Sequence, residues 1–181
     1  MLIPFNGQHT HSTSYKDIQM LTQAELQSRL NYNSITGIFT WKNPPRYSNK
    51  KDGDNAGWGC HGYIMIKINN KTYSAHRLAW LYMYNYLPPI IDHINGNPSD
   101  NRISNLRPAT LSKNQQNSKI PKSNTSGIKG VSWHKATKKW RATLNINGKL
   151  KHLGVFDDIK SAELIVREAR IKYHGEFANH G

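Results

Sequence analysis

The sequence predicts an α+β protein made of two small modules, each with short strands and at least one helix. Short β-like runs bounded by Gly, Asn and Pro alternate with segments of helical apolar periodicity. Hydrophobic residues make up only 36% of the 181 residues, which is low for one large core. A chain of this length suits one ordinary domain or two small ones, and the low apolar content favours two.

The first module is expected to open with a short helix, because Thr22 can cap it and Glu25 follows three residues later, as in a capping box. The pair Asn69-Asn70 predicts a turn between two strands. Prolines at 88 and 89 end the next helix, since proline cannot continue one. The expected elements are, in order, a helix at 22–30, strands at 38–41, 63–68 and 71–74, and a helix at 75–86, with a loop at 44–59.

The second module is expected to be a three-stranded antiparallel sheet followed by one helix. Residues 139–146 alternate with a period of two, and Asn147-Gly148 predicts a hairpin turn. Asp158 can cap the helix and Gly175 can close it. The strands are expected at 130–134, 139–146 and 149–156, and the helix at 159–174. The apolar face of this helix is expected to contain Ala162, Ile165, Val166, Ala169 and Tyr173.

These elements divide the chain into four segments. They are a mobile N-terminal arm at 1–19, a first folded module at 20–117, a basic linker at 118–126, and the sheet-and-helix module at 127–181. Residues 115–126 lack apolar periodicity and are expected to be extended. In the linker, Lys119 and Lys122 are candidates for contacts to a phosphate backbone, although a plain solvated tether explains them equally well.

The charge of the chain indicates its partner. Lys and Arg total 25 against 11 Asp and Glu, which gives a net charge of +14 and a pI near 9.9. Both halves are basic, so both modules are expected to contact a polyanion, and double-stranded DNA is the favoured one. A membrane partner is not expected, because no apolar run approaches the ~20 residues that cross a bilayer and no basic amphipathic helix stands out.

The single cysteine, Cys60, excludes a disulfide framework within the chain and a zinc site built on paired cysteines. A free thiol without a secretory signal suits the reducing cytoplasm of a bacterial or phage-infected cell. A monomer is the favoured oligomeric state.

A dense run of polar residues in the middle of the chain suggests phosphodiester chemistry. Hydrolysis needs a base for water, a divalent cation, and positive charge to neutralise the transition state. His93 can be the base, because imidazole titrates near neutral pH. Asp92 offers a carboxylate oxygen and Asn114 an amide oxygen, a small ligand set that suits Mg²⁺. Arg102 and Arg107 are candidates for contacts to DNA phosphates.

The geometry of this run depends on a hairpin and a helix. Asp92 and His93 are neighbours, so on a regular strand their side chains face opposite ways and can take different roles. A short helix capped by Thr110 or Ser112 would bring Asn114 back to Asp92.

Several runs in the first module match a known family. They are His76-Arg77-Leu78-Ala79-Trp80, Ile91-Asp92-His93-Ile94-Asn95-Gly96, Asp100-Asn101-Arg102, Asn105-Leu106-Arg107, Ala109-Thr110 and Asn114-Gln115-Gln116-Asn117. Together they resemble the HNH endonuclease family, in its zinc-free branch of phage and intron-encoded homing nucleases. The resemblance spans roughly residues 20–117.

The resemblance implies a ββα-metal (His-Me finger) fold and a role for each of four residues. His93 would be the general base, Asn105 would orient it, and Asp92 and Asn114 would bind the metal. The family implies one Mg²⁺ or Mn²⁺ ion per site without structural zinc, and products with a 3′-hydroxyl and a 5′-phosphate. Asn101 remains an alternative to Asn105 as the orienting amide, and packing at a helix start remains the alternative to a site role for His76.

The second module resembles the APETALA-two (ethylene-response-factor) DNA-binding domain through Gly130-Val131, Lys139-Trp140, Ala142, Leu153-Gly154, Phe156, Ala162 and Ala169. The resemblance implies that the sheet enters the major groove. By position, the contact face would contain Ser132, His134, Trp140, Arg141, Thr143, Asn145 and Lys151. The plant family has several arginines on these strands, so its target sequence cannot be carried over. For one of Trp133 and Trp140, core packing is the favoured alternative.

The sequence therefore predicts a metal-dependent DNA endonuclease with a C-terminal DNA-binding module. The first alternative is a non-enzymatic DNA-binding regulator on an HNH scaffold. An RNA-binding protein is the second, because basic charge and aromatic residues suit RNA as well.

Overall fold

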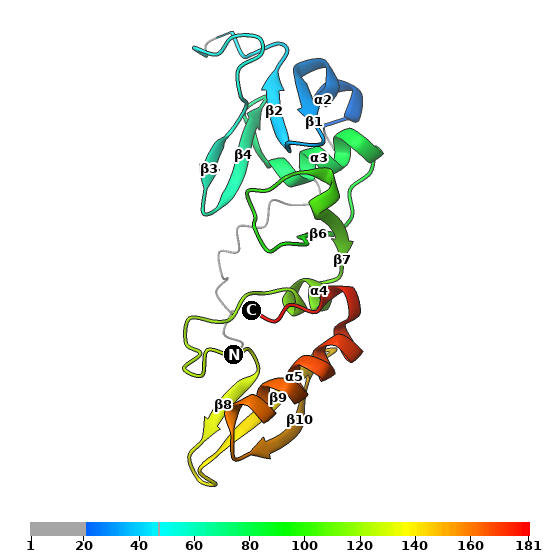
Figure 1. The fold of residues 1–181 in the computed structure, drawn as a ribbon. Helices are drawn as coiled ribbons and strands as arrows, with labels where there is room; N and C mark the ends of the chain where they lie inside the picture. The colour runs from blue at the N-terminus through cyan, green and yellow to red at the C-terminus, as the bar shows by residue number, and fades with distance from the viewer. Residues whose placement is uncertain (1–20, 47) are drawn as a thin grey trace, which may run out of the picture. The chain divides into compact units, whose positions relative to one another are not determined.

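The structure is a computed structural model that describes residues 21–46 and 48–181 in two compact units (Figure 1). The predicted mobile arm at 1–19 lies outside the described residues. The first unit comprises the described residues up to 33 together with 38–87, and the second comprises 34–37 and 88–181. Residues 90–116, which contain Asp92 and His93, thus belong to the same unit as the C-terminal sheet, whereas the sequence places a module boundary in the linker between them.

The first unit contains a hairpin, a three-stranded antiparallel sheet and two helices. Its elements are α2 (Gln23–Arg29), β1 (Leu30–Asn33), β2 (Ile38–Trp41), β3 (Trp58–Cys60), β4 (Tyr63–Ile68), β5 (Lys71–Ser74) and α3 (Ala75–Tyr84). The Thr22 cap is confirmed, because its side chain accepts a hydrogen bond from Glu25 N at 3.1 Å. The turn at 69–70 joins β4 to β5 as predicted. Strand β3 lies where the sequence predicts loop, and it pairs with β4.

Residues 90–116 of the second unit fold as two strands and a helix. Strands β6 (Ile90–His93) and β7 (Leu106–Ala109) are antiparallel, and the short 3-10 helix η1 (Ile103–Asn105) precedes β7. Helix α4 (Leu111–Gln116) follows. Of the two predicted caps Thr110 is the one used, because its side chain accepts from Lys113 N at 3.2 Å.

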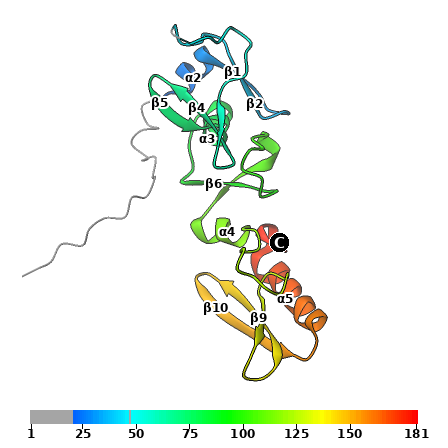
Figure 2. The same ribbon diagram turned by 90° about the vertical axis from the view of Figure 1, so that its left-hand side faces the viewer.

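The C-terminal sheet and helix have the predicted order. Strands β8 (Val131–His134), β9 (Lys139–Ile146) and β10 (Lys149–Phe156) form an antiparallel sheet in the order β10-β9-β8. Helix α5 (Ile159–His174) lies along the sheet (Figure 2), and the 3-10 helix η2 (Gly175–Phe177) follows it. The Asp158 side chain accepts from Ser161 N at 2.8 Å, which confirms the predicted cap.

The buried face of α5 differs from the prediction at its C-terminal end. Ala162 and Val166 are buried against the sheet as predicted. The next two buried positions are Arg170 and His174, while Tyr173 is 40% exposed. The sequence prediction placed Tyr173 on the buried face because helical periodicity considers only apolar residues. That periodicity gives no reason to bury the guanidinium of Arg170 or the imidazole of His174.

The prediction that residues 115–126 are extended is wrong for the first of these residues. Helix α4 continues to Gln116, and Asn117 is buried at its C-terminal cap. Lys119 and Lys122 are exposed, as contacts to a phosphate backbone require.

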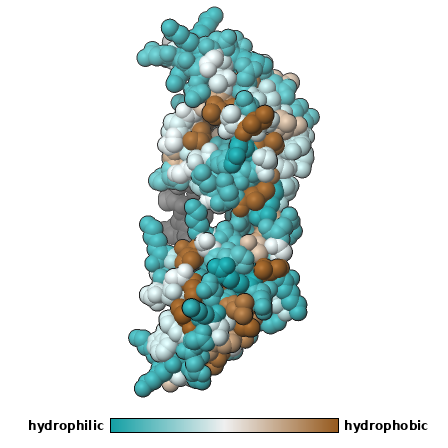
Figure 3. All heavy atoms as spheres, in the orientation of Figure 1, coloured by the Kyte–Doolittle hydropathy of each residue, from teal (hydrophilic) through white to brown (hydrophobic). Residues whose placement is uncertain are grey.

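The surface drawn in Figure 3 is largely hydrophilic, with apolar side chains dispersed among polar ones. None of the helices in the described part of the chain combines the length and apolar composition needed to cross a membrane.

Two glycines provide a test of the packing between the C-terminal sheet and its core. Gly130 and Gly127 both have a positive φ, but a Cβ on Gly130 would lie 2.6 Å from Thr143 O and 2.9 Å from Val166 Cγ2, whereas a Cβ on Gly127 meets nothing within 4 Å. We expect Gly130→Ala to lower the free energy of unfolding by about 1–3 kcal/mol more than Gly127→Ala, because only the former overpacks the core. Urea unfolding measures both, and equal losses would contradict this packing.

Candidate active site

A buried ion pair lies across the β6–β7 hairpin. Asp92 is directly opposite Arg107 in the strand register, and both Nε and Nη2 of Arg107 lie 2.8 Å from Asp92 Oδ2. Asp92 is only 4% exposed. A carboxylate at such a depth requires a charged partner, and the hairpin supplies one.

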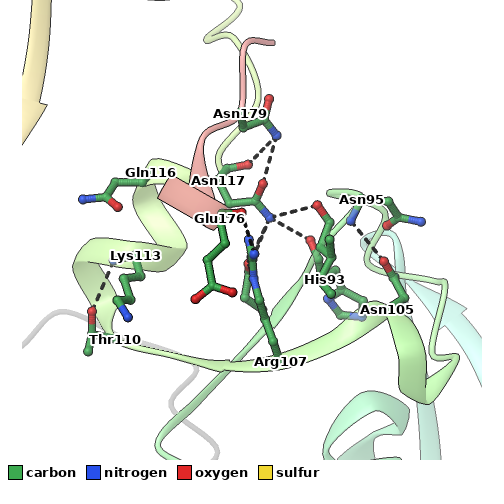
Figure 4. Close-up of polar contacts among 12 residues, drawn as sticks. His93, Asn95, Asn105, Arg107, Thr110, Lys113, Gln116, Asn117, Glu176 and Asn179 are labelled. Carbon is green, nitrogen blue, oxygen red and sulfur yellow. Dashed lines mark hydrogen bonds and ion pairs between the residues drawn. The ribbon is translucent and has the colours of Figure 1, made fainter. Parts of the chain in front are cut away.

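Asn117, at the end of α4, provides the second contact to Asp92 (Figure 4). Its Nδ2 donates to both carboxylate oxygens of Asp92 at 3.0 Å and to the carbonyl oxygen of His93 at 2.8 Å. One amide thereby ties the end of the helix to the strand that carries Asp92 and His93.

His93 is buried next to Asp92 in sequence, and its Nε2 lies 3.5 Å from Asn101 Oδ1. Burial lowers the pKa of His93 below its ordinary value of 6.5, against the opposing effects of Asn101, Asp92 and Asp100. The imidazole is therefore neutral at pH 7, which is the form that can accept a proton.

Asn105 holds the loop that follows His93. Its Oδ1 accepts from Asn95 N at 3.0 Å, and its Nδ2 donates to Asp100 O at 2.8 Å. The backbone of Asn105 also accepts from Ile94 N at 2.9 Å. The two amides thus have separate positions, since Asn101 contacts the imidazole while Asn105 braces the loop.

Arg102 and Asp100 form an exposed pair on the same loop. Arg102 Nη2 lies 2.6 Å from Asp100 Oδ2, and Arg102 Nε donates to Oδ1 at 2.8 Å. The hydrogen bond from Arg102 is the main reason that the pKa of Asp100 falls to about 2. The Arg102 side chain is 47% exposed, so it remains accessible to a phosphate.

Residues 176–179, beyond α5, pack against the two partners of Asp92. The guanidinium carbon of Arg107 lies 3.5 Å from the Phe177 ring centroid, and Arg107 Nη1 donates to Glu176 O at 2.7 Å. Asn179 Nδ2 donates to the carbonyl oxygen of Asn117 at 2.8 Å and to its Oδ1 at 3.1 Å. The C-terminal segment thus supports Asp92 indirectly, through Arg107 and Asn117.

The structure does not bring Asn114 to Asp92. Asn114 is exposed on α4, and the amide beside Asp92 is that of Asn117, one helical turn later. The spacing of the two asparagines is a signal that sequence reasoning missed, because positions i and i+3 share a helix face.

No group of three or more His, Cys, Asp or Glu side chains that could hold a metal ion occurs in residues 21–46 and 48–181.

Only some residues of the predicted DNA-contact face lie on the same face of the C-terminal sheet. Ser132 pairs with Arg141 across β8 and β9, and Thr143 and Asn145 follow Arg141 on the same face by strand alternation. His134, opposite Lys139, is on this face as well.

Trp140 and Lys151 belong to the other face, against the prediction. Trp140 packs on the core beneath α5, next to Trp133 at a ring distance of 5.0 Å, so it is the core member of the tryptophan pair. Lys151 is opposite the buried Leu144, and its Nζ donates to Tyr173 OH at 2.9 Å. The two-residue turn at 147–148 fixes this register, so the sequence already contained the signal.

Comparison with known proteins bears on this site. Residues 73–116 match the HNH endonuclease family. A relative, Protein 3.8 of Escherichia phage T7, is 44% identical over 88 residues, which cover 49% of this chain and 72% of that protein. The chain belongs to the HNH endonuclease family. No solved structure matches it.

Family membership gives the site its general chemistry. An HNH endonuclease domain implies DNA as the substrate and points to a phosphodiester hydrolase. The matched segment contains the ion pair, His93 and Asn105, and it ends one residue before Asn117. The segment that matches the family thus contains the buried residues Asp92 and His93, whereas residues 176–179 lie outside the matched segment.

Substitutions on α4 distinguish the two asparagines. We expect Asn117→Asp to lower the free energy of unfolding by about 2–4 kcal/mol, because it places a second carboxylate against Asp92 and leaves the His93 carbonyl unpaired. Asn114→Asp adds the same charge at an exposed position and should change stability by less than about 0.5 kcal/mol. Urea unfolding of both variants is the measurement, and similar losses would show that Asn117 is not the supporting amide.

Proposed function

We propose that this protein is a DNA endonuclease that uses one divalent cation, Mg²⁺ or Mn²⁺, to hydrolyse a phosphodiester to a 3′-hydroxyl and a 5′-phosphate. The observation that carries the proposal is the pairing of a buried carboxylate, Asp92, with a buried neutral imidazole, His93, on one strand of the HNH segment. A neutral imidazole can deprotonate water, and a neighbouring carboxylate can bind a cation.

The donor atoms at Asp92 fit a hard cation. Oδ2 receives both Arg107 contacts, whereas Oδ1 accepts only the N–H that it shares with Oδ2 from Asn117. Oδ1 therefore retains a lone pair for a monodentate ligand. The proposed second protein ligand is Asn114, whose exposed side chain has to turn toward Asp92 for that role. Such a cation supplies Lewis-acid stabilisation of the phosphate and keeps most of its water ligands.

The protein side chains have distinct roles in this proposal. His93 takes a proton from the attacking water and is the catalytic base. Asn101 and Asn105 are positioning residues, the first beside the imidazole and the second across its loop. Arg107 fixes Asp92 instead of contacting DNA, which replaces its expected role as a phosphate ligand. Arg102, Lys119 and Lys122 are exposed cations and are proposed to contact DNA phosphates.

The C-terminal sheet is proposed to position the enzyme on DNA. Its contact face is Ser132, His134, Arg141, Thr143 and Asn145, and it excludes Trp140 and Lys151. These side chains alternate away from α5, and a sheet face of this kind can enter a major groove. With few arginines, it is expected to bind mainly through phosphates, with partial base readout.

The nuclease proposal predicts metal-dependent nicking of supercoiled plasmid. We expect His93→Ala to lower the nicking rate by about 10²–10⁴-fold in Mg²⁺ or Mn²⁺, because general-base catalysis contributes that much. The matched control is His61→Asn, an exposed histidine outside the HNH segment, which should nick at the wild-type rate. Absence of nicking by the wild type in either metal, with DNA binding retained, would favour the non-enzymatic regulator instead.

The contact-face assignment predicts different effects for two substitutions of equal charge. Arg141→Gln should reduce the salt dependence of DNA affinity by about one phosphate contact, because Arg141 lies on the contact face. Lys151→Gln should leave the slope unchanged, because Lys151 lies on the α5 side. Fluorescence anisotropy over a salt series measures both slopes, and a larger effect of Lys151→Gln would reverse the assignment.

A further inference from the structure

A guanidinium and an imidazole continue the buried face of α5. Arg170 is 1% exposed and His174 is 9% exposed, one and two turns after the core residue Val166. Arg170 Nη2 donates to Lys129 O at 2.6 Å and Nη1 lies 3.1 Å from His180 Nδ1. Its Nε is buried without a hydrogen-bond partner.

Lys129 adds a second cation beside Arg170. Its Nζ donates to the carbonyl oxygens of Gln116, the last residue of α4, and of Ser118, and to Asn179 O at 3.2 Å. Burial, together with the charge of Arg170, lowers the pKa of Lys129 to about 8. The ammonium is thus held by backbone dipoles in a positively charged neighbourhood.

Buried charges in proteins are normally paired with opposite charges. Among the residues that the structure describes, no carboxylate forms a hydrogen bond or ion pair with Lys129, Arg170 or His174. His174 Nε2 lies 2.9 Å from Asn145 O, and its Nδ1 is buried without a partner. The cluster therefore has excess positive charge and two unused polar nitrogens.

The three side chains line one cavity of about 290 Å³. Ser112 and Gln115 of α4, and Thr143 of β9, contribute hydroxyl and amide groups to the same wall. The volume is at the lower end of the range for small-molecule sites, so it suits a compact polar ligand. The cavity lies within the second unit and contains none of the residues Asp92, His93 and Asn105.

We propose that this cavity binds a phosphate group. A tetrahedral oxyanion has acceptor atoms in several directions, which matches a lining of guanidinium, hydroxyl and amide donors. The guanidinium and ammonium offset the charge of a phosphate, and the unpartnered Arg170 Nε gains an acceptor. The phosphate belongs either to a DNA backbone or to a free phosphate ion. The inference does not rest on the nuclease proposal, because the cavity is lined by none of the residues proposed to bind the metal or to act in catalysis.

The experiment measures binding of inorganic phosphate to the full chain by isothermal titration calorimetry, with chloride at equal ionic strength as the blank. We expect saturable binding by the wild type and its loss in Arg170→Gln. Because Arg170→Gln removes a buried side chain and can unfold the protein, Gln115→Glu is the deciding variant. It adds a negative charge to the cavity wall from an exposed position on α4 and should weaken binding at least fivefold.

The matched control is Leu111→Glu, which adds the same charge to α4 at an exposed position outside the cavity and should bind phosphate as the wild type does. Unphosphorylated duplex DNA distinguishes the two sources, since competition with phosphate indicates a backbone ligand and independent binding indicates free phosphate. No saturable phosphate binding above the chloride blank, or equal binding by Gln115→Glu and Leu111→Glu, would overturn the proposal.

Discussion

The buried carboxylate of Asp92 is the constraint around which the second unit is arranged. A charge at 4% exposure is tolerated only with partners, and each of its partners comes from a different element. The hairpin register supplies Arg107, the end of α4 supplies Asn117, and residues 176–179 pack against both. The run of residues 90–117 around Asp92 is therefore completed by residues some 60–70 positions later in the chain. This dependence explains why that run and the C-terminal sheet form one compact unit.

The features that could be predicted from sequence are those that local chemistry determines. The caps Thr22, Thr110 and Asp158 and the turn at 147–148 act within four residues, so they can be recognised without a fold. Asn117 could not be ranked above Asn114, because both lie on one face of α4 and only tertiary packing separates them. Arg170 and His174 were missed for a related reason: helical periodicity selects apolar residues, and a buried cation becomes plausible only once a polar cavity is present. Lys151 differs from these cases, since the hairpin register already places it opposite Leu144.

The C-terminal segment links two regions that sequence reasoning treated separately. Lys129 donates to Asn179 O, and Asn179 donates to Asn117, which in turn donates to Asp92. The proposed phosphate cavity and Asp92 therefore share a short chain of hydrogen bonds within one unit. In an enzyme that acts on DNA, such an arrangement would couple two features through the same few residues. These features are the contacts to the DNA backbone and the geometry around Asp92.

We propose that Asp92 holds the divalent cation with which this HNH-family protein cuts DNA. The most direct measurement is the number of Mn²⁺ ions bound per chain in the presence of duplex DNA, by electron paramagnetic resonance of the free ion. Both samples should carry His93→Ala, so that the DNA stays intact, and one should carry Asp92→Asn in addition. We expect one bound ion with Asp92 present and its loss in the double variant. Equal Mn²⁺ binding by the two proteins would contradict it.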